Sequence, residues 1–303
     1  MKIDVIGIGI SVVDFVMVIP SFPTEGTKMG AMSYIIQGGG PVATALVTLA
    51  KLGAKAAYLG KVAKDEIGKY IKYEFEQYGV ITDYIIEERG QSPIAVVLVN
   101  MKNGERTIIW SEGDLSPLSY EELKLMQQSI TSAKFIHLDG HYPQAVLKAI
   151  EIAKSCGVKV SLDAGNVYPD IDKIIQFTDV LITSENFPTE FTGERDLNKA
   201  GKQLLEKGPQ VVVITKGDKG CLCITHDEII SQPAFKVKVV DTTGAGDAFH
   251  GAFLYGLIQG WNMRKILEFS CAVAAMNCTK VGGRSGLPTL EEVKKFIGGY
   301  KRF

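Results

Sequence analysis

From about residue 120 onward, predicted helices and strands alternate along the chain, and this alternation constrains the fold more than any other feature. The predicted helices are 120–132, 143–156, 196–207 and one that starts at Asp247, and the predicted strands are 134–138, 158–162, 179–183, 210–215 and 235–240. Strands that alternate with helices pair in parallel and carry helices on both faces of the sheet. The pattern therefore predicts an α/β fold with a doubly wound, mostly parallel sheet flanked by helices.

The first 110 residues interrupt this pattern. After a buried strand at 3–8, further strands are predicted at 12–19, 31–36, 94–101 and 106–110, with a hairpin turn at 102–104. Strands that do not alternate with helices suggest a small separate sheet, formed by about 12–36 and 92–110, that lies as a lid over a ligand site at the strand ends. We expect the whole chain, 1–303, to form one domain with this lid.

Composition narrows the functional class. The net charge is −1, whereas a nucleic-acid-binding protein needs a dominant positive face. The five cysteines include no C-x-x-C pair, which argues against a disulfide framework or a zinc site. Asp4 and Asp14 bracket only nine uncharged residues, too few to cross a membrane, and no cleavage site follows. We expect a cytoplasmic protein that contacts neither membrane nor nucleic acid.

The most informative segment is Val239–Phe249, in which a strand is predicted to run through a glycine-containing turn into a helix. Gly244 and Gly246 allow the backbone to bend and approach a ligand, and the amides of Ala245, Gly246 and Asp247 would be unpaired at the helix start. Such amides bind anions, including the charge-rich transition state of phosphoryl transfer. Asp247 could be a simple helix-terminal acid, but beside these glycines it is better suited to accept a proton from an attacking hydroxyl.

Two segments together resemble one family. Asp241–Asp247 resembles the signature of the ribokinase-like (PfkB) carbohydrate kinases, and Gly38–Ala45, with Pro41 at a predicted helix start, resembles that family's N-terminal glycine motif. The resemblance extends in order from Asp4 to about Pro288, and some segments resemble ketohexokinase-type members. It implies a ribokinase-like fold and ATP-dependent phosphorylation of a sugar hydroxyl.

The resemblance also implies residue roles around the sugar. Asp247 is the expected catalytic base, and Gly244, Ala245 and Gly246 are the expected anion hole. In many relatives Asn occupies the position of Gly40, so one sugar hydrogen bond is expected to be missing or replaced, with room for a larger substrate. The expected substrate contacts are Asp14, Gly38, Gly39, Gly40, Arg106, Trp110 and Asp139.

Nucleotide and metal contacts are implied in the same way. The expected ATP contacts are Ser184, Thr215, Lys216, Gly217, Gly220, Ala274 and Cys278, with Lys216 alternatively a solvated surface lysine. Relatives often have N-x-x-E at 184–187, where this chain places Phe187 in the acidic position, so Glu185 is the substitute candidate for water-mediated Mg²⁺ and Asp163 a weaker one. Asp241 and Thr243 match family positions associated with K⁺, or they simply form the turn.

The motifs of other nucleotide-binding classes are incomplete or missing. Gly7-Ile8-Gly9 follows the first strand, but Val12 replaces the third glycine of a dinucleotide fingerprint, and no P-loop segment exists. A non-catalytic sugar sensor would be expected to lose Asp247 or the anion-hole glycines. A nucleoside kinase of the same fold remains the alternative to a sugar kinase.

Pairing of the small sheet with its copy would give a homodimer.

Overall fold

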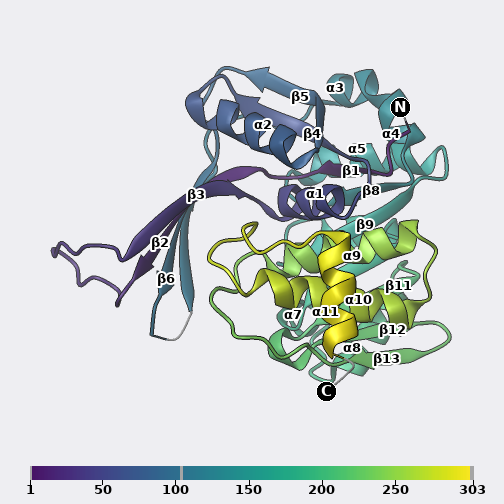
Figure 1. Cartoon of the computed structure of the whole chain (residues 1–303). Coiled ribbons are helices and arrows are strands. Elements are labelled where there is room, and N and C mark those ends of the chain that lie inside the picture. Colours follow the sequence, from purple (N-terminus) through teal and green to yellow (C-terminus); the bar gives the residue numbers. More distant parts are fainter. Residues whose placement is uncertain (1, 103–104, 301–303) are drawn as a thin grey trace.

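The main sheet forms the centre of the molecule (Figure 1). The computed structural model describes residues 2–102 and 105–300, and within these residues the sheet has nine strands. Their spatial order is β13 (Ile229–Gln232), β12 (Cys221–Thr225), β11 (Val211–Thr215), β10 (Val180–Ser184), β9 (Lys159–Ala164), β8 (Phe135–Leu138), β1 (Val5–Ile8), β4 (Ala56–Ala63) and β5 (Ile81–Glu88). From β11 to β5 neighbouring strands run parallel, whereas β12 and β13 are antiparallel. The predicted α/β fold is confirmed.

Helices cover both faces of this sheet and bury two separate hydrophobic cores. One core includes side chains of α1 (Pro41–Lys51), α2 (Glu66–Tyr78), α9 (Ala245–Ile258), α10 (Met263–Asn277) and α11 (Leu290–Tyr300). The other includes side chains of α3 (Tyr120–Leu125), α4 (Gln127–Ser132), α5 (Pro143–Lys154), α6 (Ile171–Gln176), α7 (Asn186–Thr192) and α8 (Leu197–Leu205). Strand side chains alternate between the two cores, as in a doubly wound sheet.

Two predicted elements differ in the structure. The helix expected over 120–132 is divided at Met126 into α3 and α4. The strand expected over 235–240 does not form, because the amides of Val240 and Asp241 bond to the carbonyl of Cys278 and not to a neighbouring strand. Its apolar side chains are instead divided between the core and the surface, with Phe235 buried and Val239 exposed. Tertiary pairing has overridden the local strand preference.

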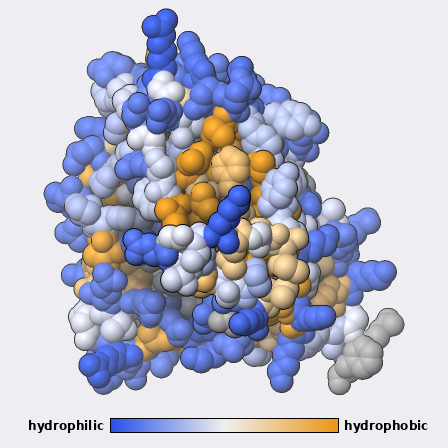
Figure 2. Space-filling view, turned by 90° about the vertical axis from the view of Figure 1, so that its left-hand side faces the viewer, coloured by the Kyte–Doolittle hydropathy of each residue, from blue (hydrophilic) through white to orange (hydrophobic). Residues whose placement is uncertain are grey.

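A second, smaller sheet projects from the body (Figure 1). Its strands lie in the order β3 (Ser33–Gly39), β2 (Val12–Ile19), β6 (Ile94–Asn100) and β7 (Arg106–Ser111). Apolar side chains are exposed on it, and Figure 2 shows apolar surface near the middle of the face on this side of the molecule. The small lid sheet inferred from the sequence is therefore present, although the turn residues 103–104 lie outside the described part.

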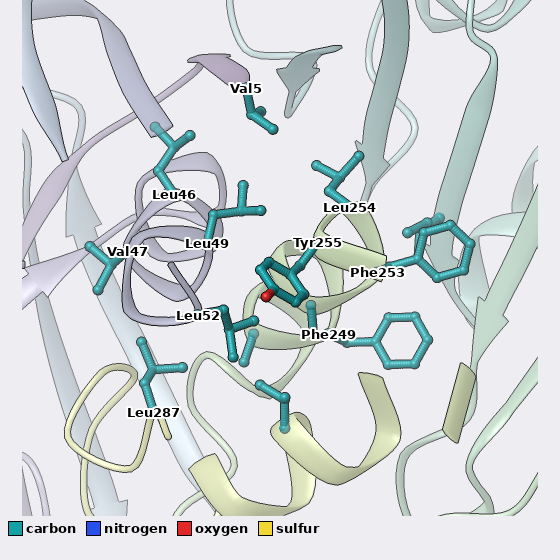
Figure 3. Close-up of a cluster of buried hydrophobic side chains, with 14 of the residues drawn as sticks. Val5, Leu46, Val47, Leu49, Leu52, Phe249, Phe253, Leu254, Tyr255 and Leu287 are labelled. Carbon is teal, nitrogen blue, oxygen red and sulfur yellow. The ribbon is translucent and has the colours of Figure 1, made fainter. Parts of the chain in front are cut away.

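The helices that follow the two glycine motifs pack directly against each other. Figure 3 shows Leu46 and Leu49 of α1 lying in the same buried cluster as Leu254 and Tyr255 of α9. Close-packed cores transmit position between elements because they deform little. The shared core therefore fixes the start of α1 relative to the start of α9.

Within residues 2–102 and 105–300, none of the helices has the length and apolar character needed to cross a membrane.

Candidate active site

The turn before α9 is held in place by one buried carboxylate. Asp241 Oδ1 accepts hydrogen bonds from the Thr243 amide at 2.9 Å and the Thr243 hydroxyl at 2.7 Å, and Oδ2 accepts one from the Gly282 amide at 2.8 Å. Gly244 then adopts φ 71° with Gly283 packed against it, so a side chain at this position would be strained and would collide with backbone.

Free amides follow this turn. Helix α9 begins at Ala245, two residues before the predicted start at Asp247, and among the described residues none accepts a hydrogen bond from the amides of Gly246 or Asp247. The Ala245 amide, also expected to be unpaired, instead donates to the Thr242 carbonyl at 3.3 Å. Open space surrounds Gly246, since a Cβ built there would meet no atom within 4 Å. The turn therefore offers unpaired N–H groups at a helix N-terminus, the arrangement that binds anions.

Asp247 lies in the first turn of α9, partly accessible beside these amides. Burial raises the pKa of its carboxyl to about 7, and the negative charges of Asp14 and Asp139 add to the rise, against the guanidinium groups of Arg106 and Arg284. A carboxylate with a pKa near neutrality is well matched to accepting a proton at physiological pH.

The charge of Asp14 acts on Asp247, and Asp14 also packs against the glycine motif. Asp14 is buried in β2, and burial raises its pKa to about 6 although the charge of Arg284 opposes the rise. Its carboxylate packs so closely on Gly39 that a side chain there would collide with it, and Gly40 has φ 96° beside the carbonyl of Ile10. Glycine is required at both positions by close approach or by backbone conformation.

Asp139 follows β8 and is bonded within the protein. Its carboxylate accepts from the amides of Ile10 at 2.9 Å and His141 at 3.1 Å, and it lies 3.2 Å from His141 Nδ1. The Trp110 ring, half exposed on the lid, is 6.3 Å from the ring of His141. The structure thus brings predicted residues from the lid, β2, β8 and α9 to one region.

The lid also contacts the turn before α9. The Nη1 atom of Arg106, at the start of β7, donates to the Thr242 hydroxyl at 2.6 Å. Arg106 is therefore close to the free amides and to Asp247.

A cleft of about 510 Å³ is lined in part by Ala245 and Gly246 at the start of α9. The predicted residues that line it are Thr215, Gly217, Gly220, Ala245, Gly246, Ala274 and Cys278. Ser184, Glu185 and Lys216 are not among its lining residues; the Lys216 amide instead donates to the Gly220 carbonyl at 2.7 Å. The size and largely apolar lining suit a nucleotide base, with the anion-binding turn at one end.

The metal expectations can be compared with the donors present. Among the described residues, no group of three or more His, Cys, Asp and Glu side chains is arranged to hold a metal ion. Ser184 and Glu185 are exposed at the end of β10. At the turn, both Asp241 oxygens accept from protein donors, and the Thr243 carbonyl accepts from Asn277 Nδ2 at 3.1 Å. These acceptors are therefore already hydrogen-bonded within the protein.

Several residues around the site were not predicted. Arg284 and Glu74 are buried together beneath Gly38 and Gly39. Asp163, expected above only as a weaker Mg²⁺ candidate, lies on β9 at 3.5 Å from the buried and unpredicted His250, and the pKa of Asp163 is raised by burial and by the charge of Asp247. Sequence offers little signal for such residues, because a charged side chain is buried only when distant segments supply its partners.

The chain is similar to known proteins over nearly its whole length. The model of the family described as pfkB family carbohydrate kinase matches residues 2–290. An uncharacterized sugar kinase of Archaeoglobus fulgidus is 32% identical over 248 residues, 79% of this chain and 98% of that protein. The ribokinase of Haemophilus influenzae is 30% identical over 290 residues, 94% of this chain and 95% of that protein.

A solved structure has the same fold. Ribokinase of Arabidopsis thaliana, determined in complex with ribose and ATP, superimposes with a TM-score of 0.85 at 25% identity. The superposition covers 98% of this chain and 99% of that chain.

Proposed function

The chain belongs to the pfkB family of carbohydrate kinases and is an ATP-dependent sugar kinase, and we propose that Asp247 and the turn at 244–246 transfer the γ-phosphoryl group of ATP to a hydroxyl of a small sugar or sugar derivative. The observation that carries this proposal is the position of the free amides of Gly246 and Asp247. Gly246 lines the apolar cleft, and the next residue, Asp247, has its carboxyl within the electrostatic influence of Asp14. The turn therefore joins the cleft to these carboxylates, and a phosphoryl group that passes from nucleotide to sugar moves along it.

In this proposal Asp247 orients the acceptor hydroxyl and takes its proton as the new P–O bond forms. The amides of Gly246 and Asp247 stabilise the negative charge on the transferring group. The proton moves to the Asp247 carboxylate, while the bond between the γ-phosphorus and the bridging oxygen of ATP breaks and the charge leaves with ADP. The raised pKa of Asp247 supports this role because the carboxyl can hold the proton after transfer.

We assign sugar recognition to Asp14, Gly38, Gly39 and Gly40. Asp14 is a buried acceptor for sugar hydroxyls, and the glycines let the sugar approach the backbone. The Asp139 carboxylate already accepts hydrogen bonds from the backbone amides of Ile10 and His141. We therefore assign Asp139 to fixing the segment after β1 and the position of His141. Trp110 stacks over the sugar from the lid, and Arg106 closes the lid on the turn.

The cleft beside α10 is assigned to ATP. Ala274 and Cys278 provide apolar contact for the base, and Thr215, Gly217 and Gly220 contact the ribose and phosphates. Ser184 and Lys216 lie outside the cleft lining, so we assign them no direct contact with the base. Mg²⁺ carried by the nucleotide would neutralise phosphate charge, with Glu185 reaching it through water.

We propose that protein donors, rather than K⁺, hold the turn before α9. Asp241 and Thr243 are bonded to each other, and Asn277 spans the carbonyls of Thr243 and Gly283 at 3.1 Å each. No catalytic step is assigned to a monovalent cation.

We also propose a homodimer formed through the small sheet. Tyr34 on β3 and Ile109 on β7 are 70% and 63% exposed, and each lies on a strand with one unpaired edge. Exposed apolar edge strands are usually covered by a partner. Light scattering at micromolar concentration should give twice the mass of one chain, and a monomer there would contradict the proposal.

The test of the proposed function is an ADP-release assay with ketoses, aldoses, 2-keto-3-deoxy sugar acids and nucleosides as acceptors. One acceptor class should give turnover, and Asp247→Ala should lower kcat by about 10²–10⁴-fold. Lys148→Ala, on the exposed face of α5, is the control and should retain wild-type kcat. Undiminished turnover by Asp247→Ala, or turnover with nucleosides alone, would contradict the proposal.

A further inference from the structure

A complete ion pair is buried beneath the two glycines of the N-terminal motif. Arg284 is only 1% exposed and Glu74 only 8% exposed. Arg284 comes from the loop after α10, and Glu74 comes from α2, so the pair joins segments 210 residues apart. Charged side chains at this depth need several partners to compensate their desolvation.

The partners are the backbone of the glycine motif. Arg284 Nη1 donates to Glu74 Oε2, Nη2 donates to the Gly39 carbonyl at 3.0 Å, and Nε donates to the Thr44 hydroxyl at 3.2 Å. Glu74 Oε2 also accepts from the Gly38 amide at 2.8 Å. The ion pair therefore bonds both the Gly38 amide and the Gly39 carbonyl.

The residues next to Arg284 hold the other glycine motif. The Gly282 amide donates to Asp241 at 2.8 Å, and the Gly283 carbonyl accepts from Asn277, which also bonds Thr243. Gly283 packs against Gly244. One short loop is thus bonded to the sugar-side backbone at Gly39 and to the turn before α9.

Stability alone does not account for this arrangement. Replacing a buried ion pair by apolar side chains of similar volume is often neutral or stabilising, so such a pair is weak evidence for a stabilising role. Its bonds instead fix the backbone on which Asp14 packs, since the Asp14 carboxylate lies directly against Gly39. Misplacement of a substrate-binding group by about 1 Å can cost on the order of 10²-fold in rate.

We propose that Arg284 and Glu74 are positioning residues that set the Gly38–Gly39 backbone, and through it Asp14, for binding of the acceptor sugar. This inference rests on the proposed function. It assigns the pair no contact with either substrate.

The main test is the double variant Glu74→Met/Arg284→Met, which removes both charges and retains apolar volume. We expect it to fold with a Tm near that of the wild type, to raise the KM for the sugar by about 10- to 100-fold, and to leave the KM for ATP nearly unchanged. Lys154→Met is the control, because Lys154 forms a partly buried ion pair with Asp179 on a distant part of the sheet. It should alter Tm without altering either KM.

A pH profile adds a readout that a purely structural role would not move. Among the charged groups around Asp247, Asp14 and Asp139 raise its pKa, while Arg106 and Arg284 lower it. Removal of Arg284 should therefore shift the acid limb of kcat to higher pH. An unchanged sugar KM and an unshifted acid limb in the folded double variant would overturn the proposal.

If the double variant does not fold, Arg284→Lys decides the question. Lysine retains the charge beside Glu74 but cannot reach Gly39 and Thr44 with a planar fork. A raised sugar KM with an unchanged ATP KM supports the positioning role, and equal KM values for wild type and variant overturn it. Wild-type protein without turnover on any acceptor would instead refute the proposed function, which separates the two failures.

Discussion

The guanidinium of Arg106 on the lid donates a 2.6 Å hydrogen bond to the hydroxyl of Thr242, 136 residues away in the turn before α9. This bond connects the lid directly to the turn that carries the free amides. The position of the lid and the geometry of the turn are therefore coupled.

Without the hydrogen bond between Arg106 and Thr242, the lid should close less firmly over the substrate. We expect Arg106→Ala to lower kcat/KM for the sugar by about tenfold, because the lid loses its bond to the turn and Asp247 loses a nearby positive charge. Steady-state kinetics with varied sugar measures the effect. Lys102→Ala, on the same hairpin, is the matched control, and an equal loss in both variants would contradict a specific role for Arg106.

Activity should depend on pH through Asp247. Its pKa is raised to about 7, and the carboxyl must be deprotonated to accept a proton, so kcat should fall about tenfold per pH unit well below pH 7. Asp14→Asn removes a negative neighbour that raises this pKa, so the acid limb should move to lower pH even though sugar binding weakens. A pH profile of kcat at saturating sugar measures both; a limb that stays in place would refute the coupling.

The same carboxyl should reduce stability at neutral and alkaline pH. The folded pKa of Asp247 is about 7 against a usual value of 3.8, so the folded state is favoured by this group at low pH and loses that advantage as the pH rises through 7. We expect Asp247→Asn to be more stable than wild type by about 1–3 kcal/mol at pH 8, with the difference vanishing near pH 4. Denaturant melts at both pH values measure this, and a larger difference at pH 4 would contradict it.

The apolar cleft should be required for ATP and not for the sugar. Ala274→Phe fills part of the cleft beside α10, so the KM for ATP should rise at least about tenfold. Sugar binding measured by calorimetry in the absence of nucleotide should be unchanged. Arg264→Ala, at the exposed start of α10, is the control, and a normal ATP KM in Ala274→Phe would place the nucleotide elsewhere.

Turnover should not require K⁺. Protein donors already serve Asp241 and the Thr243 carbonyl, so replacing KCl by choline chloride at constant ionic strength should change kcat less than about twofold. A large loss of activity without K⁺ would contradict the proposal that protein donors alone hold this turn.

The α/β class, the small lid sheet and the two glycine motifs could be predicted from the amino-acid sequence. These features are encoded locally: helical and strand periodicities repeat within a few residues, and Gly244 and Gly40 are required by their own backbone conformations. The family resemblance rests on the same local segments, and the pfkB match over residues 2–290 confirms it.

Other features depend on contacts between distant segments and arise only in the folded chain. The segment 235–240 has the sequence pattern of a strand, yet the Val240 amide donates to the Cys278 carbonyl, and no strand forms over these residues in the described structure. Arg284 lies in a glycine-rich loop, yet it is buried because Glu74, Thr44 and Gly39 contact it from distant segments. A charged side chain is buried only where folding brings its partners together, so no local sequence pattern predicts its burial.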